Sequence, residues 1–259
     1  ALITQLFQYR FGQGEALQGH SFGNLFITAL AAVTGSFERA ILEASRVLAV
    51  QGRILPSTLE DVTLVADLKV EDSAEPSGLA RVKGESAIPQ TRQPIERVFL
   101  QPEEARAYPE AVRAILDADL IVAGPGSLFT SVLPNLLVRD IRRAVEASPA
   151  KRLYVCNVAT QPGETDGFDV GQHMSALQHH VGPRLFPFVL ANDRALPGQE
   201  QPVALHYPHH AGYKVIAADV VDPAIPWRHD SGRLAEQVLR FLREQEQVDR
   251  IEAVPADTL

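Results

Sequence analysis

The sequence predicts an α/β fold with a mainly parallel sheet, and three observations lead to this prediction. Amphipathic helical patterns alternate along the chain with short apolar runs, which is the order of elements in α/β proteins. Residues 120–123 and 153–158 are apolar runs of the kind found in buried parallel strands, and Asp119 and Gly124 bound the first of them. The 259 residues contain no internal repeat and no convincing linker, so we expect one domain over residues 1–259.

The spacing of apolar residues predicts each element in turn. The expected elements are, in chain order, a helix over 22–34, a helix over 37–48, strands at 62–68 and 95–100, a helix over 102–116, strands at 120–123, 153–158, 188–190 and 214–217, and a helix over 231–245. Gly35 ends the first helix, Ser36 caps the second and Pro102 stands where the third begins. Residues 71–94 and 193–212 lack a regular pattern, and we interpret them as an excursion and a long loop.

The composition excludes several classes of protein. The formal net charge of −8 disfavours wholesale binding to nucleic acid or to an anionic membrane, since both need an attractive field. A single cysteine, Cys156, permits neither an intrachain disulfide nor a cysteine-rich zinc site, so a cytoplasmic location is the simplest expectation. No apolar run approaches the ~18 residues of a transmembrane helix, and we see no signal peptide. The chain begins at Ala1 rather than at methionine, so we expect the native N-terminus to lie upstream.

A glycine-rich turn follows the first predicted parallel strand. Gly124 and Gly126 would let the backbone approach a ligand, and N–H groups at a helix start attract phosphate. Ser127, Thr130 and Ser131 add hydroxyl donors. The pattern matches neither the dinucleotide fingerprint, nor a Walker A loop, nor a nucleophile elbow. The turn therefore predicts an anion or phosphate site, and the alternative is a tight strand–helix turn without a ligand.

Two further segments carry candidate binding groups. His20 could hydrogen-bond a phosphate and Asn24 a base or sugar edge, unless this segment is only a helix start that Ser21 caps. After the strand at 153–158, Asn157 and Thr160 are neutral polar groups suited to a sugar or a base.

The turn beyond Thr160 and the start of the last helix also carry polar residues that could have either a functional or a purely structural role. Glu164 and Asp166 lie in a Pro/Gly-rich turn, and we interpret them as solvated acids. Arg228 is suited to a phosphate or carboxylate, whereas Asp230 could simply cap the last helix and leave Arg228 as a surface charge. The histidine pairs have no acidic or cysteine partner in the pattern, so we expect no metal ligand.

Taken together, these segments resemble one family closely. The matching stretches are GHSFGNL at 19–25, IVAGPGSLFTSVLPNLLV at 121–138, YVCNVATQPGET at 154–165 and RHD at 228–230. They resemble the YvcK, or gluconeogenesis factor, family of the CofD-like superfamily. The resemblance implies a Rossmann-like three-layer fold and a cytoplasmic protein. It also implies a non-catalytic regulatory factor that binds UDP-N-acetylglucosamine and supports cell shape and wall synthesis during gluconeogenic growth.

The resemblance also implies roles for particular residues. Arg228 matches the arginine that helps to hold the uridine nucleotide, and the turn at 124–131 would lie in the same crevice as Asn157 and receive the diphosphate. Family members begin with a strand and a glycine-rich loop that this sequence lacks, so we expect the domain over 1–259 to be without them. A homo-oligomer stays open.

The alternative from the same superfamily is an enzyme. A CofD-type 2-phospho-L-lactate transferase would act on a nucleotide diphospho-substrate with magnesium, and positioning and charge stabilisation would supply most of the catalysis. The sequence offers no convincing nucleophile–base pair, so we expect no catalytic residue, and magnesium enters only under this alternative.

Overall fold

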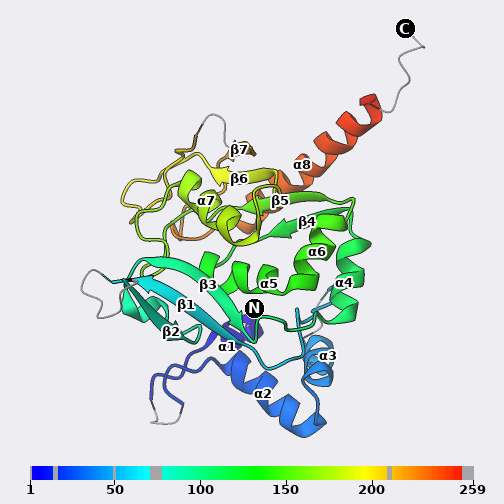
Figure 1. Cartoon of the computed structure of the whole chain (residues 1–259), viewed down its shortest axis with the longest axis vertical. Helices are drawn as coiled ribbons and strands as arrows, with labels where there is room; N and C mark the ends of the chain where they lie inside the picture. The colour runs from blue at the N-terminus through cyan, green and yellow to red at the C-terminus, as the bar shows by residue number, and fades with distance from the viewer. Residues whose placement is uncertain (1, 14–16, 49–50, 71–77, 209–211, 253–259) are drawn as a thin grey trace. The chain divides into compact units, whose positions relative to one another are not determined.

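The computed structural model describes residues 2–13, 17–48, 51–70, 78–208 and 212–252 (Figure 1). The chain divides into two compact units, of which the first holds residues 1–59 and 108–111 and the second holds residues 60–107 and 112–259. The expectation of one domain over the whole chain stays a prediction.

The first unit is helical. It contains α1 (Leu2–Gln8), α2 (Phe22–Thr34) and α3 (Phe37–Val47). Ser21 caps α2, because its hydroxyl oxygen accepts a hydrogen bond from the backbone N–H of Asn24, and Ser36 caps α3 in the same way. Gly35 ends α2 at φ 68°, in the left-handed region that glycine adopts without strain. Both predicted helices and their caps are confirmed.

The second unit contains a small antiparallel sheet in the order β2-β1-β3. Its strands are β1 (Thr63–Lys69), β2 (Leu79–Lys83) and β3 (Ile95–Gln101), and a short 3-10 turn, η1 (Pro89–Thr91), precedes β3. The sequence predicted β1 and β3, but it left β2 inside the excursion at 71–94. A strand of five residues with little burial has no clear pattern of its own, and its pairing with β1 specifies it.

A buried carboxylate holds this sheet together. The side chain of Asp67, in the central strand, is 4% exposed and makes ion pairs with Arg81 on β2 and Arg97 on β3, each at 2.8 Å. Both guanidinium groups also lie over the ring of Phe99. The hydrogen bond from Arg81 is the main reason why the pKa of Asp67 lies below its usual value.

The larger sheet is parallel throughout and has the order β4-β5-β6-β7. Its strands are β4 (Leu120–Ala123), β5 (Lys151–Val155), β6 (Phe188–Asn192) and β7 (Lys214–Ala218). The helices around it are α4 (Pro109–Leu116), η2 (Leu128–Val132, a π-helical turn), α5 (Leu133–Leu137), α6 (Arg139–Ala147), α7 (Val170–Val181) and α8 (Ser231–Glu252). The predicted α/β fold with a Rossmann-like parallel sheet is confirmed.

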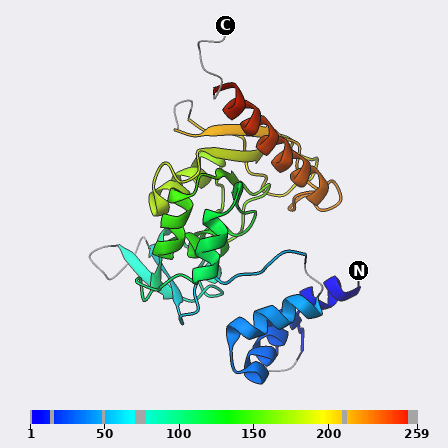
Figure 2. The same cartoon turned by 90° about the vertical axis from the view of Figure 1, so that its right-hand side faces the viewer.

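Helices cover both faces of the parallel sheet, which gives three layers (Figure 2). On the α8 face, Leu153 and Val155 of β5 pack with Leu190 of β6 and Phe241 of α8 in a buried cluster. Tyr154, between them, is also fully buried, and strand alternation turns it towards the opposite layer, where α5, α6 and α7 lie. No helix in the described ranges is both long enough and apolar enough to span a membrane.

Three predicted boundaries are wrong. The helix expected at Pro102 begins only at Pro109, because Glu60 accepts hydrogen bonds from the backbone N–H and the guanidinium of Arg106 and holds that segment outside the helix. The strand expected over 153–158 ends at Val155. The last helix continues beyond residue 245 to Glu252.

We expect Asp67→Asn to destabilise the protein by about 1–2 kcal/mol at pH 7, because the buried side chain loses the charge that pairs with both arginines. The loss stays modest because both arginine side chains are more than half exposed, so water screens their ion pairs with Asp67. A depressed folded-state pKa stabilises the fold above the unfolded-state pKa of about 4, and this contribution is lost as pH falls through the folded-state value. Urea unfolding at pH 7 and about pH 3 should therefore show the difference between the two proteins shrinking in acid. A difference that stays constant with pH would contradict the ion-pair explanation.

Candidate functional site

A cavity of about 570 Å³ lies at the carboxyl edge of the parallel sheet. Three segments surround it: the turn after β4, the loop after β5, and the loop between β7 and α8. The residues that line it are Pro125, Gly126, Asn157, Val158, Ala159, Thr160, Gln161, Pro162, Trp227, Arg228, His229, Ser231 and Leu234. Ligands of open parallel sheets bind at this edge, so the position itself marks the cavity as a candidate site.

The glycine turn after β4 is fixed against the end of β5. Gly124 has φ 89°, and a Cβ atom there would lie 2.8 Å from the carbonyl oxygen of Val155, so only glycine fits. Asn157 joins this turn to the next loop: its side-chain oxygen accepts from the N–H of Gly126 at 3.3 Å, and its amide nitrogen donates to the carbonyl of Gly126 at 2.9 Å and to the side chain of Gln161 at 3.2 Å. One neutral side chain thus sets the distance between two walls of the cavity.

The hydroxyl groups of the turn meet groups of the protein itself. Ser127 accepts a hydrogen bond from the side-chain amide of Gln161 at 2.8 Å, and Thr130 donates to Glu164 at 2.9 Å. Glu164 is buried, and we were wrong to interpret it as a solvated acid. A turn composition of proline and glycine predicts exposure, and nothing local in the sequence shows that this side chain folds back onto Thr130.

The carboxyl group of Glu164 occupies the start of η2. Burial raises the pKa of its carboxyl group, while the hydroxyl of Thr130 and the backbone N–H groups of Phe129 and Thr130 lower it in part. Its second oxygen has no hydrogen-bond partner at normal distance within the described chain. A carboxyl group of the protein therefore lies where the sequence predicted an external anion.

The loop after β5 turns back at Gly163. The carbonyl of Gln161 accepts from the N–H groups of Glu164 and Thr165, which closes a tight turn. Gly163 has φ 81°, and a Cβ atom there would lie 2.0 Å from the carbonyl oxygen of Pro89. The turn thus lies directly on η1, and this contact leaves no room for any side chain at position 163.

A third segment supports the cavity from outside. Residues 201–203 run alongside 158–160, since the N–H of Thr160 donates to the carbonyl of Gln201 and the N–H of Val203 donates to the carbonyl of Val158. The side-chain amide of Gln199 donates to the carbonyls of Val158 and Pro226 and so connects the loops on both sides of the cavity.

The loop that carries Arg228 is tightly folded. One carboxylate oxygen of Asp222 accepts from the N–H groups of Ala224 and Ile225, and the backbone of Arg228 bonds to both Asp222 and Ile225. Asp230 caps α8, because its carboxylate accepts from the N–H of Arg233 at 2.9 Å. The side chain of Arg228 is exposed and makes no hydrogen bond or ion pair with any other residue that the structure describes.

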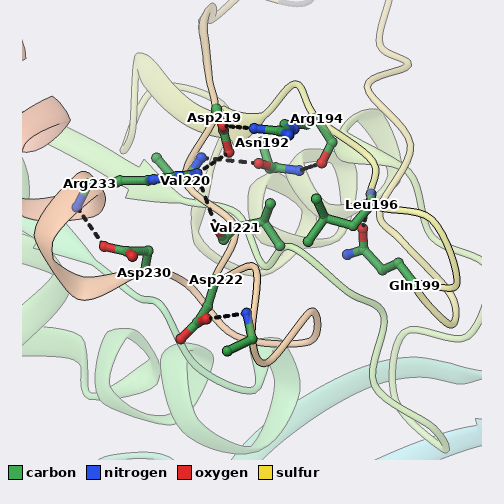
Figure 3. Close-up of polar contacts among 11 residues, drawn as sticks. Asn192, Arg194, Leu196, Gln199, Asp219, Val220, Val221, Asp222, Asp230 and Arg233 are labelled. Atoms are coloured by element: carbon green, nitrogen blue, oxygen red, sulfur yellow. Dashed lines mark hydrogen bonds and ion pairs between the residues drawn. The ribbon is translucent and has the colours of Figure 1, made fainter.

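Two other arginines nearby form ion pairs within the protein (Figure 3). Arg194 lies 2.8 Å from one carboxylate oxygen of Asp219, just after β7, and Arg233 lies 2.8 Å from the other. The side-chain oxygen of Asn192, at the end of β6, accepts a hydrogen bond from the adjacent backbone N–H of Val220. The hydrogen bond from Arg194 is the largest cause of the lowered pKa of Asp219. These two cations share one internal carboxylate, whereas Arg228 has no such partner among the described residues.

The remaining titratable groups at the cavity do not form a nucleophile–base pair. His229 is mostly buried, its ring nitrogen lies 3.2 Å from the carbonyl of Cys156, and burial lowers its pKa, so it is neutral near pH 7. Burial raises the pKa of Cys156, as expected of an inert thiol. None of the residues that line the cavity is acidic.

The structure brings some of the predicted site residues together and separates others. Gly126, Asn157, Thr160 and Arg228 line one cavity. The predicted residues of the glycine turn that do not line it are Gly124, Ser127, Thr130 and Ser131. His20 and Asn24 lie in the first unit, where both side chains are exposed. The roles of all ten stay predictions.

Comparisons with known proteins agree on one family. The family model described as 2-phospho-L-lactate transferase CofD matches residues 1–242. The gluconeogenesis factor of Bacillus subtilis is 45% identical over 198 residues, which cover 76% of this chain and 60% of that protein. A protein of Thermoanaerobacterium thermosulfurigenes, provisionally named a gluconeogenesis factor, is 43% identical over 256 residues and covers 93% of this chain.

The chain is shorter than these relatives. It spans 76% of the Thermoanaerobacterium protein and 54% of a similarly named protein of Nostoc, to which it is 42% identical. Among solved structures, a member of the UPF0052 family from Bacillus halodurans has a TM-score of 0.78 at 37% identity, covering 92% of this chain and 78% of that one.

The contact of Gly163 with Pro89 leads to a paired prediction. We expect Gly163→Ala to cost about 3 kcal/mol or more, because it adds a steric overlap to an unfavourable φ. Gly167→Ala is the matched control: its φ of 71° is similar but no atom lies within 4 Å of the added Cβ, so only the backbone cost of about 1–2 kcal/mol applies. Urea unfolding measures both, and equal losses would show that the turn does not depend on its contact with η1.

Proposed function

We propose that this chain, which belongs to the CofD family and within it to the gluconeogenesis factors, binds UDP-N-acetylglucosamine. It would do so as a non-catalytic regulatory factor in the cytoplasm, supporting cell shape and wall synthesis during gluconeogenic growth.

The observation that carries this proposal is an unpaired guanidinium group beside a cavity with neutral polar walls. Arg228 has no partner among the described residues, and a guanidinium binds phosphate oxygens through two parallel hydrogen bonds. The side-chain oxygens of Asn157 and Thr160 can still accept hydrogen bonds from sugar hydroxyls, and Gln161 has a second N–H group that can donate to an oxygen of the ligand. A volume of about 570 Å³ is within the range of small-molecule sites.

The surroundings of the glycine turn favour one position for the diphosphate. Thr130 already donates its hydroxyl proton to Glu164, so this hydroxyl is not available to donate to a phosphate. We therefore assign the diphosphate to the side of the cavity where Arg228 lies, and not to the first turn of η2. Gly126 and Asn157 would then face the sugar.

The alternative function is a CofD-type transferase, which the description of the matching family model favours. A phosphoryl-group transferase of that type needs carboxylates that hold magnesium. No acidic residue lines the cavity, and no cluster of three or more histidine, cysteine or acidic residues suited to a metal ion occurs in the described ranges. This supports binding without turnover, and the two functions differ in their products: a transferase would consume a nucleotide diphospho-substrate when magnesium is added.

We expect Arg228→Ala to weaken binding of UDP-N-acetylglucosamine by about tenfold to a hundredfold, because a charged hydrogen-bond donor contributes about 1.5–3 kcal/mol. Arg240→Ala is the matched control, since this arginine forms only an exposed i,i+4 pair with Glu244 on α8. Calorimetric titration compares the three proteins, and product analysis with and without magnesium is run on the same samples.

Three outcomes are decisive. Saturable binding that only Arg228→Ala weakens, with the ligand recovered intact, supports the proposal. Equal affinity of wild type and Arg228→Ala would remove Arg228 from the site. Consumption of a nucleotide diphospho-substrate in the presence of magnesium would replace the proposal with the transferase.

A further inference from the structure

A second hollow of about 340 Å³ adjoins the candidate cavity. The two share one wall, which is made by Ala159, Thr160, Pro162 and Trp227. The far side of the second hollow is made by the loop after β6, which contributes Gly198, Glu200 and Gln201. Neither the glycine turn nor Arg228 reaches it, so its chemistry differs from that of the first cavity.

Trp227 is the unusual residue of the shared wall. It is the only tryptophan in the sequence, and 67% of it is exposed. Tryptophan is mostly buried in folded proteins, and an exposed indole on the rim of a hollow is typical of a surface that awaits a partner.

The backbone on both sides of Trp227 is held in place. The carbonyl of Pro226 accepts a hydrogen bond from Gln199 at 2.8 Å, and the backbone of Arg228 is bonded to Asp222 and Ile225. The indole therefore projects from an ordered loop, so little conformational entropy would be lost when a flat ligand packs on it.

Gln201 supplies a polar group opposite this wall. It has φ 50°, one of two positive values among the described residues other than glycine, and such backbone conformations concentrate at functional sites. Its side-chain oxygen accepts from the hydroxyl of Thr160 at 3.1 Å, which leaves the amide N–H groups without a partner in the described chain. An amide N–H group beside an aromatic surface can donate a hydrogen bond to an acceptor on the edge of a heterocycle that stacks there.

The two hollows differ in the charge of the residues that line them. The first has the cation of Arg228 and no acid, whereas the second has the carboxylate of Glu200 and no cation. A phosphate would be attracted to the first and repelled from the second. A carboxylate can, however, accept a hydrogen bond from the ring N–H of a base.

We propose that the second hollow is a nucleobase subsite in which the base stacks on Trp227 and Gln201 donates a hydrogen bond to a carbonyl on the base edge. The diphosphate of the same ligand would lie on the Arg228 side of the shared wall. This inference rests on the proposed function, and it adds the residues that select a pyrimidine carrying a carbonyl and a ring N–H.

The single tryptophan makes the test direct. The whole chain is titrated with UDP-N-acetylglucosamine, UDP and N-acetylglucosamine 1-phosphate, and indole fluorescence and calorimetric heat are recorded together. We expect both uridine ligands to quench the fluorescence more strongly than the sugar phosphate, which has no base to stack on the indole. Trp227→Ala should weaken UDP binding about tenfold or more, and Trp227→Phe should recover part of that loss. Gln201→Glu should weaken binding of UDP without affecting that of the sugar phosphate.

The outcomes separate this inference from the function on which it rests. Calorimetric binding of UDP-N-acetylglucosamine with no change in fluorescence and no loss in Trp227→Ala would overturn the nucleobase subsite and leave the proposed function standing. Absence of any calorimetric binding by the folded wild-type chain would overturn both. Arg240→Ala serves again as the unaffected control.

Discussion

The parallel arrangement of β4 to β7 is the constraint on which the rest of the second unit depends. Strands that run the same way deliver all their carboxyl ends to one edge, so the polar residues that follow each strand meet there. Asn157 then fixes the glycine turn against the loop after β5, Gln199 fixes that loop against the one before α8, and Asp219 holds two arginines at the end of β7. The cavity is the space that these three connections leave between them.

The polar groups at this edge fall into two kinds. Those with partners inside the protein, such as Thr130 with Glu164 and Arg194 with Asp219, give the loops their shape. Arg228 and the amide nitrogen of Gln201 have none among the described residues, and Trp227 is exposed beside them. The side chains of Arg228 and Gln201 are both exposed, and hydrogen bonds hold the backbone of the two loops that carry them.

Sequence periodicity predicted α2, α3, α8 and six of the seven strands of the described ranges, but it gave no range for α1, α5, α6 or α7. α2 and its caps follow from local spacing and from Ser21 and Gly35, and β4 to β7 follow from short apolar runs. β2 could not be predicted, because its pairing with β1 specifies it. In the candidate site, Asn157 was singled out because it follows a parallel strand and Arg228 because it precedes the last helix, and both line the cavity. Trp227 is a lone aromatic in a loop and belongs to no pattern.

The short distance from Arg228 to α8 has a mechanical consequence. α8 begins at Ser231, three residues further along the chain, and its 22 residues form a rod about 33 Å long. Asp230 caps this rod and Arg233 ties it to Asp219, so the loop is joined rigidly to the start of the helix. Further along α8, Phe241 is buried against β5 and β6, and Asp249 forms an ion pair with Lys151 of β5. The loop beside the cavity is therefore anchored through α8 to the same sheet whose strands lead into the other two walls.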